Sequence, residues 1–113
     1  MSNVLTTSLS ALADPTRRAI LQLLRARDLS AGEIAANFEI SLPSVSHHLA
    51  TLKAAELVTT QRRGQNIIYS LNATVMQEFL QLLMTTFGTE AHEQKPNKVN
   101  GENQLPINVS QLW

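Results

Sequence analysis

The chain has 113 residues, in which nine Lys and Arg balance nine Asp and Glu, and it contains no cysteine. The lack of cysteine excludes a disulfide scaffold, a thiolate metal site and a cysteine nucleophile. The formal net charge of zero argues against a protein that binds polyanions through diffuse positive charge. We expect one domain, because a chain of this length buries about two thirds of its unfolded surface in a single core.

No run of the sequence approaches the ~20 consecutive apolar residues that a membrane-spanning helix needs. The N-terminal stretch also lacks the basic start and the apolar run of a signal peptide. We therefore expect a cytoplasmic protein that does not insert into a membrane.

The first part of the chain predicts two helices. Leu5, Leu9 and Leu12 recur at helical spacing, which indicates a first helix that ends just before Asp14. Asp14 can cap a second helix, and Pro15 suits the first position of that helix because its missing N–H would be unpaired there anyway. We expect the second helix to end near residue 28, with its arginines mostly facing outward.

A short third helix and a longer fourth helix follow. Ser30 and Glu33 have the spacing of a capping box, which predicts a helix over residues 31–38. Ser41 is the next candidate cap, and the fourth helix is expected to run from there to about residue 55. One stripe of this fourth helix is apolar and is expected to face the core: Leu42, Val45, Leu49 and Leu52.

The hydrophobic pattern then changes. Residues 57–62 and 66–71 are rich in β-branched side chains, and the link between them contains Gly64, which favours a tight turn. This predicts a β-hairpin. Asn72 can cap a last helix that is apolar on most sides and must be covered on most sides. Beyond residue 88 the composition becomes polar, so we expect a folded domain over residues 1–88 and a flexible tail over residues 89–113.

A short helix, a tight turn and a longer helix, followed at once by a hairpin with two arginines near its tip, are the arrangement of a winged helix-turn-helix. The predicted fold class is therefore mainly α with a small β-hairpin, in which about five helices accompany a two-stranded wing. In this fold the fourth helix is the recognition helix. Its outer face must be small or polar to enter the ~12 Å wide major groove of DNA.

The outer face of the fourth helix and its start supply the first candidate DNA contacts. They are Ser41, Pro43, Ser44, Ser46, His47 and Thr51. Serine and histidine can bond to base edges or phosphates, and unpaired amides at a helix start can bind a phosphate. The sequence has no acidic residue from 41 to 55, which favours a DNA contact over an ordinary solvated face. His48 diverges from His47 by 100° along the helix, so we expect it at the margin of the core.

The hairpin tip supplies the second set of candidates, Arg62, Arg63 and Gln65. Guanidinium groups suit phosphates or a narrow minor groove. Arginines in a surface loop are often only solubilising charge, but their position just after a recognition helix favours a phosphate contact. Residues 41–72 hold three basic residues and one acidic residue, so the neutral total hides a modestly basic segment.

Several runs of the sequence resemble the ArsR family of bacterial transcriptional repressors. They are ADPTRR at residues 13–18, AGEIA at 31–35, SVSHHL at 44–49, LKAA at 52–55 and RGQNIIYSLN at 63–72. The likeness covers residues 11–84, and the hairpin and short last helix are most similar to the SdpR-type autorepressors of that family. The resemblance implies a homodimer on a double-stranded DNA operator, with the two recognition helices in successive major grooves.

The same resemblance implies that the first and last helices join the dimer. The apolar residues that fit this role are Leu5, Leu9, Met76, Phe79, Leu80, Leu83 and Phe87. We expect no cofactor and no metal, because many family members use a Cys-x-Cys motif or Asp and His on the last helix, where this chain has only Glu78. Glu56 stands where the family often has glycine, and it is mildly strained if its backbone is left-handed.

Other functions stay open on the sequence. One is a winged-helix module that binds a protein, with the tail ending in Trp113 as its ligand or dock. Another is a metal-responsive repressor with histidine and carboxylate ligands, for which His92 with Glu90 and Glu93 is the local cluster. We do not expect an enzyme, because the sequence has no phosphate-binding glycine motif and no Gly-x-Ser-x-Gly elbow.

Overall fold

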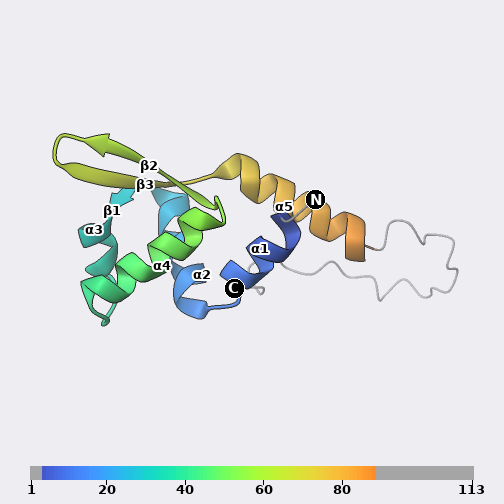
Figure 1. The fold of residues 1–113 in the computed structure, drawn as a ribbon, viewed down its shortest axis with the longest axis horizontal. Helices are drawn as coiled ribbons and strands as arrows, with labels where there is room; N and C mark the ends of the chain where they lie inside the picture. Colours follow the sequence, from blue (N-terminus) through green and yellow to red (C-terminus); the bar gives the residue numbers. More distant parts are fainter. Residues whose placement is uncertain (1–3, 89–113) are drawn as a thin grey trace, which may run out of the picture.

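The computed structural model describes residues 4–88 as five helices and one three-stranded antiparallel sheet (Figure 1). The helices are α1 (Val4–Ala11), α2 (Pro15–Ala26), α3 (Ala31–Ala35), α4 (Leu42–Ala54) and α5 (Ala73–Phe87). The strands are β1 (Leu29–Ser30), β2 (Val58–Arg63) and β3 (Asn66–Leu71), in the order β1-β3-β2. The predicted mainly α fold with a hairpin wing is confirmed. Within these residues no helix is both long and apolar enough to cross a membrane.

The predicted N-caps define where four of the helices begin. Each cap accepts a hydrogen bond from the backbone N–H three residues later: Asp14 from Arg17 at 3.0 Å, Ser30 from Glu33 at 3.2 Å, Ser41 from Ser44 at 3.2 Å and Asn72 from Val75 at 3.3 Å. Glu33 completes the capping box, because its Oε1 accepts from the Ser30 N–H at 2.8 Å. Since one such cap contributes about 1 kcal/mol, local sequence is enough to set these helix starts.

The core lies where α2, α3, α4 and the hairpin meet. Val45, Leu49 and Leu52 carry α4 into it and are all 0% exposed, as the predicted stripe requires. Ile20 of α2 and Ile34 of α3 are also 0% exposed. Burial of each such side chain contributes about 1.5–3 kcal/mol, so this stripe sets the rotation of α4 about its own axis.

The prediction that Leu42 belongs to the buried stripe of α4 is wrong. Leu42 is 49% exposed, although its spacing matches that of Val45 and Leu49. Leu42 is the first residue of α4, and helical side chains tilt towards the N-terminus of their helix. The Leu42 side chain is therefore carried past the end of the helix and away from the core.

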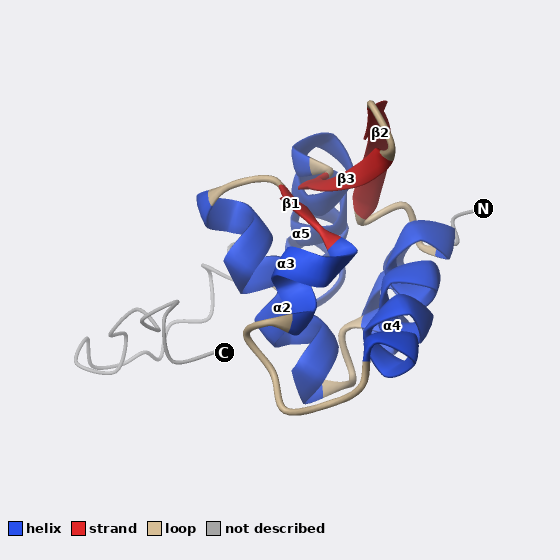
Figure 2. Ribbon diagram, turned by 90° about the vertical axis from the view of Figure 1, so that its left-hand side faces the viewer, coloured by secondary structure: helices blue, strands red, loops and turns tan. Residues whose placement is uncertain are grey.

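The wing has a third strand that the sequence analysis did not predict (Figure 2). In β1, Leu29 pairs with Tyr69 and Ser30 pairs with Ile68 of β3. A two-residue strand is too short to show an alternating pattern, so no sequence signal marks it. It ties the start of α3 to the hairpin, because Ser30 is both a strand residue and the cap of α3.

Three helices end earlier than the sequence predicted. The expected ends were close to residue 13 for α1, residue 28 for α2 and residue 38 for α3, whereas these helices end at Ala11, Ala26 and Ala35. After α3 the N–H groups of Asn37 and Phe38 bond to carbonyls three residues back, at 3.0 Å each. Such tightened last turns are common at helix ends, and hydrophobic spacing does not reveal them.

The end of α4 adopts a geometry that normally calls for glycine. Glu56 has a φ of 62°. Its N–H bonds to the Lys53 carbonyl at 2.8 Å and the Leu57 N–H bonds to the Leu52 carbonyl at 3.0 Å, which together form a Schellman motif. Leu52 and Leu57 are both 0% exposed, so the turn delivers the chain directly from α4 into the hairpin. Mild strain was expected at Glu56 if its backbone were left-handed, and its backbone is left-handed.

Replacing Glu56 with glycine is expected to stabilise the fold. Glycine carries no Cβ penalty at positive φ, and after the entropy it adds to the unfolded chain the net gain is about 0.5–1 kcal/mol. Urea denaturation of the full chain measures this change. Glu56→Ala is the control, because it removes the same charge but keeps a Cβ. Equal stability of the glycine and alanine variants would show that the backbone at this position is not strained.

Candidate nucleic-acid interface

The buried stripe of α4 leaves a small, polar face pointing away from the core. Pro43, Ser44, Ser46, His47 and Ala50 are all exposed on it. Among these five, no side chain is acidic and none is larger than histidine. The structure therefore assembles the predicted outer face over the first half of α4.

Ser41 and Ser44 form the rim of this face at the start of α4. The Ser41 hydroxyl accepts from the Ser44 N–H at 3.2 Å and donates to the Ser44 hydroxyl at 3.1 Å. Ser41 therefore uses its donor and an acceptor site within the cap, whereas the Ser44 hydroxyl keeps its own proton to donate. Ser44 is the better placed of the two for a base or a phosphate.

The helix start offers fewer amides than we expected. Pro43 has no N–H, Ser44 N–H is taken by the Ser41 side chain, and Val45 N–H bonds to the Ser41 carbonyl at 3.0 Å. Of the first four helical residues, only Leu42 retains an N–H outside these bonds. The predicted contribution of free backbone amides to phosphate binding is thus largely removed by the cap and the proline.

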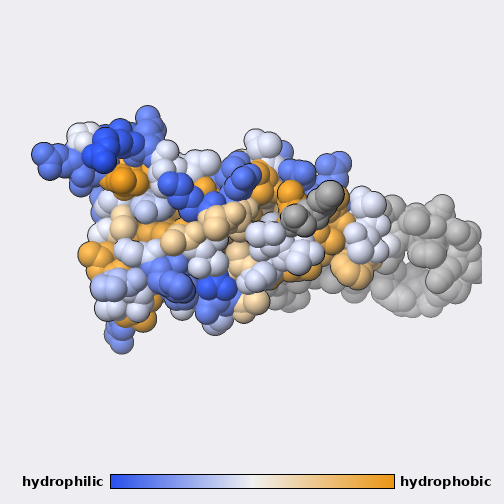
Figure 3. All heavy atoms as spheres, viewed as in Figure 1, coloured by the Kyte–Doolittle hydropathy of each residue, from blue (hydrophilic) through white to orange (hydrophobic). Residues whose placement is uncertain are grey.

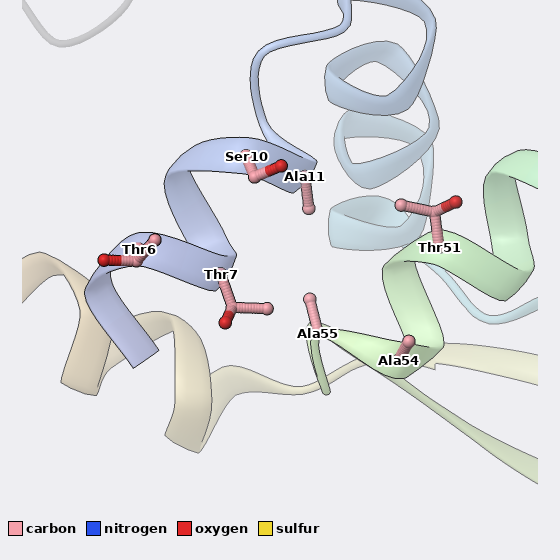
Figure 4. A pocket seen from close by; sticks show the side chains of 7 residues that line it. All are labelled: Thr6, Thr7, Ser10, Ala11, Thr51, Ala54 and Ala55. Carbon is pink, nitrogen blue, oxygen red and sulfur yellow. The ribbon is translucent and has the colours of Figure 1, made fainter. Parts of the chain in front are cut away.

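Thr51 does not share the outer face to the degree predicted. Its side chain is half-buried, and its hydroxyl donates to the His47 carbonyl at 3.2 Å. It also lines a cleft between α1 and α4 (Figure 4). Thr51 therefore lies at the edge of α4 that faces α1, and its hydroxyl proton is already committed to the helix backbone.

The two adjacent histidines have different surroundings, as predicted. The His47 side chain is exposed, whereas the His48 side chain is only 18% exposed. Their ring centroids are 6.0 Å apart at an angle of 60°, so the rings are not arranged as a pair. His48 Nδ1 lies 3.4 Å from Arg17 Nη1 and 3.9 Å from Asp14 Oδ2. His47 is left to face solvent or DNA, while His48 joins α4 to α2.

The two arginines in the first turn of α2 are placed differently from our expectation. Arg17 and Arg18 are half-buried, not turned outward. Arg17 Nε donates to the Ala11 carbonyl at 2.7 Å, and Arg18 Nη1 donates to the Leu12 carbonyl at 2.8 Å. These carbonyls belong to the end of α1 and the turn after it, and cationic donors are favourable at such an end. Helical spacing alone could not reveal this contact across a turn.

Asp14 carries the negative charge of this cluster. The Arg17 backbone N–H that donates to its carboxylate lowers the pKa of Asp14 below the ordinary value of 3.8, against the opposing effect of burial, and the nearby Arg17 guanidinium lowers it further. Asp14 is therefore ionised at neutral pH. Its charge stabilises the N-terminus of α2, where the helix dipole is positive.

The hairpin tip presents the second predicted set of residues. Arg63 pairs with Asn66 across a two-residue turn that begins at Gly64, whose φ is 63°. Arg62, Arg63 and Gln65 are all exposed, and the tip is strongly hydrophilic at the upper left of Figure 3. Among residues 4–88, no acidic side chain lies within ion-pair distance of either arginine. Both guanidinium groups are thus available to an external anion.

The residues predicted for dimer contacts divide into three groups. Leu9, Leu80 and Phe87 are 44%, 47% and 68% exposed, and Leu5, Met76 and Leu83 are half-buried. Phe79 is only 4% exposed within the single chain, so it offers little surface to a partner.

Met84 is 56% exposed and was not among the residues predicted for the dimer interface. It lies one turn from both Leu80 and Phe87, and the three form an apolar row on α5.

Within residues 4–88, no three His, Asp or Glu side chains come together in a way that could hold a metal ion. The cluster of Glu90, His92 and Glu93 lies outside the described residues, and so do Trp113 and the rest of the predicted tail.

Comparison with known proteins connects this geometry to a family. Residues 14–60 match the model of the family described as "Bacterial regulatory protein, arsR family". The transcriptional repressor SdpR of Bacillus subtilis (strain 168) is 53% identical over 74 residues, which are 66% of this chain and 82% of that protein. An arsenical resistance operon repressor of Staphylococcus xylosus is 43% identical over 68 residues, or 60% of this chain and 65% of that protein.

Solved structures give the same picture. An ArsR-like transcriptional regulator from Rhodococcus sp. RHA1 superposes with a TM-score of 0.70 at 26% identity, covering 85% of this chain and 95% of that one. HlyU from Vibrio cholerae superposes with a TM-score of 0.63 at 31% identity, covering 77% and 98% of the two chains. The match therefore extends beyond the helix-turn-helix to most of the described fold.

Proposed function

The chain belongs to the arsR family of bacterial regulatory proteins, and we propose that it acts as a homodimeric repressor that reads double-stranded DNA with α4 and holds the DNA backbone with its wing. Membership of the family makes the chain a DNA-binding transcriptional regulator. The proposal adds which residues bind, how the two subunits meet and where the protein acts. A cytoplasmic site of action, where operators are available, and the lack of a catalytic role are parts of it.

The outer face of α4 carries this proposal. A helix comes close to the bases of a major groove ~12 Å wide when its exposed side chains are compact, and it is not repelled by the phosphates when they carry no negative charge. The exposed residues Pro43, Ser44, Ser46 and His47 meet both conditions, and the cap at Ser41 holds the first turn rigid. We assign base-edge contacts to Ser44, Ser46 and His47, with Pro43 in apolar contact beside them.

Phosphate contacts are assigned to the wing. Arg62, Arg63 and Gln65 are exposed, and no acidic group among residues 4–88 neutralises the arginines. Guanidinium groups bind phosphate oxygens in a forked geometry and carry no sequence information when they do so. Ser41 and Thr51 are assigned lesser roles at the edge of the interface, because their hydroxyl protons are used within the chain.

Alanine substitutions separate base reading from phosphate binding. His47→Ala is expected to relax sequence preference and to weaken binding to the preferred duplex about tenfold. Arg62→Ala or Arg63→Ala is expected to weaken binding to all duplexes alike and to reduce the slope of log affinity against log salt by about one. Fluorescence anisotropy measures both effects, on a duplex that the wild-type chain selects from a random-sequence library and on a scrambled duplex.

Arg25→Ala is the matched control for these substitutions, because Arg25 is an exposed arginine of α2 outside the proposed interface. If Arg62→Ala and Arg63→Ala behaved like Arg25→Ala, the wing would not contact phosphates. If His47→Ala kept the full preference for the selected duplex, His47 would not read bases.

We assign the dimer interface to α1 and α5. These two helices pack against each other within the chain, yet Leu9, Leu80, Met84 and Phe87 remain 44–68% exposed. An apolar surface of this kind is costly to leave in water and is typical of an interface between subunits. A two-fold dimer also places two α4 helices on one face of the DNA, which doubles the modest positive charge of the reading segment.

The substitution Met84→Glu is expected to break the dimer, because it puts a charge in the middle of the apolar row on α5. Sedimentation equilibrium should then report a monomer, and affinity for the selected duplex should fall about a hundredfold as the second half-site is lost. Thr85→Glu is the control, since Thr85 is exposed on another side of the same helix. A Met84→Glu variant that remained dimeric would place the interface elsewhere.

We further propose that the protein represses its own gene. Its similarity to SdpR and the resemblance of its hairpin to that of the SdpR-type autorepressors support this assignment. Self-repression requires an operator in the DNA upstream of the chain's own reading frame, so nuclease footprinting of that DNA should reveal a protected site. Full cleavage of this DNA by the nuclease, under conditions where a selected duplex is protected, would contradict self-repression alone.

A further inference from the structure

Arg17 connects three helices through one guanidinium group. From its position on α2, Nε donates to the Ala11 carbonyl at 2.7 Å and Nη2 donates to the Ser10 carbonyl at 3.3 Å, both at the end of α1. The remaining nitrogen, Nη1, lies 3.4 Å from Nδ1 of His48 on α4. One side chain therefore joins the end of α1 to the middle of α4.

Side-chain packing between α1 and α4 is incomplete. A cleft of about 350 Å³ separates them, with Thr6, Thr7, Ser10 and Ala11 on the α1 side and Thr51, Ala54 and Ala55 on the α4 side (Figure 4). Short side chains line both walls. Arg17 bonds to the carbonyls of Ser10 and Ala11, two residues that line this cleft, so its hydrogen bonds help to set the distance between the two helices.

Arg18 provides an internal comparison. It is the next residue of α2, it is also half-buried, and its Nη1 donates to the Leu12 carbonyl just after α1 at 2.8 Å. No hydrogen bond joins Arg18 to α4 among the described residues. The two arginines thus stabilise the same helix end, but only Arg17 also reaches the recognition helix.

We propose that Arg17 is a positioning residue for DNA recognition, which fixes the orientation of α4 relative to α1 through His48. This inference rests on the proposed function, because it requires α1 to belong to the dimer interface and α4 to enter the major groove. In such a dimer the link between α1 and α4 sets the separation of the two recognition helices. That separation must match half-sites about one helical turn apart.

His48 must accept a hydrogen bond for this link to form. A guanidinium can only donate, so the bond needs an unprotonated Nδ1. Asparagine can place a carbonyl oxygen close to the position of Nδ1, whereas leucine fills similar space without an acceptor. The pair His48→Asn and His48→Leu therefore tests the bond without touching the end of α1.

A direct phosphate contact by Arg17 is the competing explanation for any loss of DNA binding. Three of its nitrogens are already engaged within the chain, which argues against that role. The two roles differ in salt dependence. A lost phosphate contact lowers the slope of log affinity against log salt by about one, whereas a misplaced recognition helix loses affinity mainly through the bases.

The experiment compares Arg17→Gln with Arg18→Gln in the full chain. The probes are the duplex that the wild-type chain selects from a random-sequence library and versions in which the half-sites are moved by one base pair. Arg17→Gln is expected to bind the selected duplex about tenfold more weakly than Arg18→Gln, with an unchanged salt slope and a smaller penalty for altered spacing. Urea denaturation measures how much free energy of unfolding each variant loses with its hydrogen bonds to the carbonyls at the end of α1.

The His48 variants keep the test decisive if Arg17→Gln does not fold. His48→Asn should bind within about twofold of the wild type, and His48→Leu should show the weaker binding and relaxed spacing expected of Arg17→Gln. If His48→Asn and His48→Leu bound equally well, or Arg17→Gln matched Arg18→Gln, the positioning role would be wrong while the proposed function stood. If the wild-type chain selected no duplex, the proposed function and this inference would both fail.

Discussion

Burial of one side of α4 is the constraint on which the rest of the structure depends. Val45, Leu49 and Leu52 are completely buried, and together they fix the rotation of the helix about its axis. Because helical residues advance by 100°, the opposite face is then determined, and it consists of small and polar side chains. The proposed recognition surface therefore follows from packing in the core. A helix with the same outer residues but a weaker stripe could not hold them at one angle to DNA.

The turns at the two ends of α4 shape the proposed binding surface. At its start, Ser41 and Pro43 order the first turn but leave few free backbone amides, so the proposed recognition depends on side chains. At its end, the left-handed Glu56 sends the chain straight into β2, so the arginines of the wing follow α4 at a short, defined interval. A neutral protein can thus concentrate modest positive charge beside the helix that we propose to read sequence.

Sequence patterns predicted the parts of the fold that depend on neighbouring residues. The caps at Asp14, Ser30, Ser41 and Asn72, the hairpin and the different surroundings of His47 and His48 were all predictable, because each depends on spacing along the chain. What sequence could not predict depends on distant contacts or on end effects. The strand β1 exists only through β3, Leu42 is exposed because it begins a helix, Arg17 bonds to carbonyls at the end of α1, and Thr51 faces α1 across a cleft. The sequence showed that α5 carries more apolar residues than one helix face holds. It did not show which of these residues are buried within the single chain.

In the proposed function, the outer face of α4 reads DNA sequence as part of a two-fold dimer. Selection of duplexes from a random-sequence library by the purified full chain is the decisive experiment. We expect enrichment of one motif made of two inverted half-sites, with their centres about 10 base pairs apart. A library that emerged without an enriched motif, or with a single half-site and no two-fold symmetry, would contradict it.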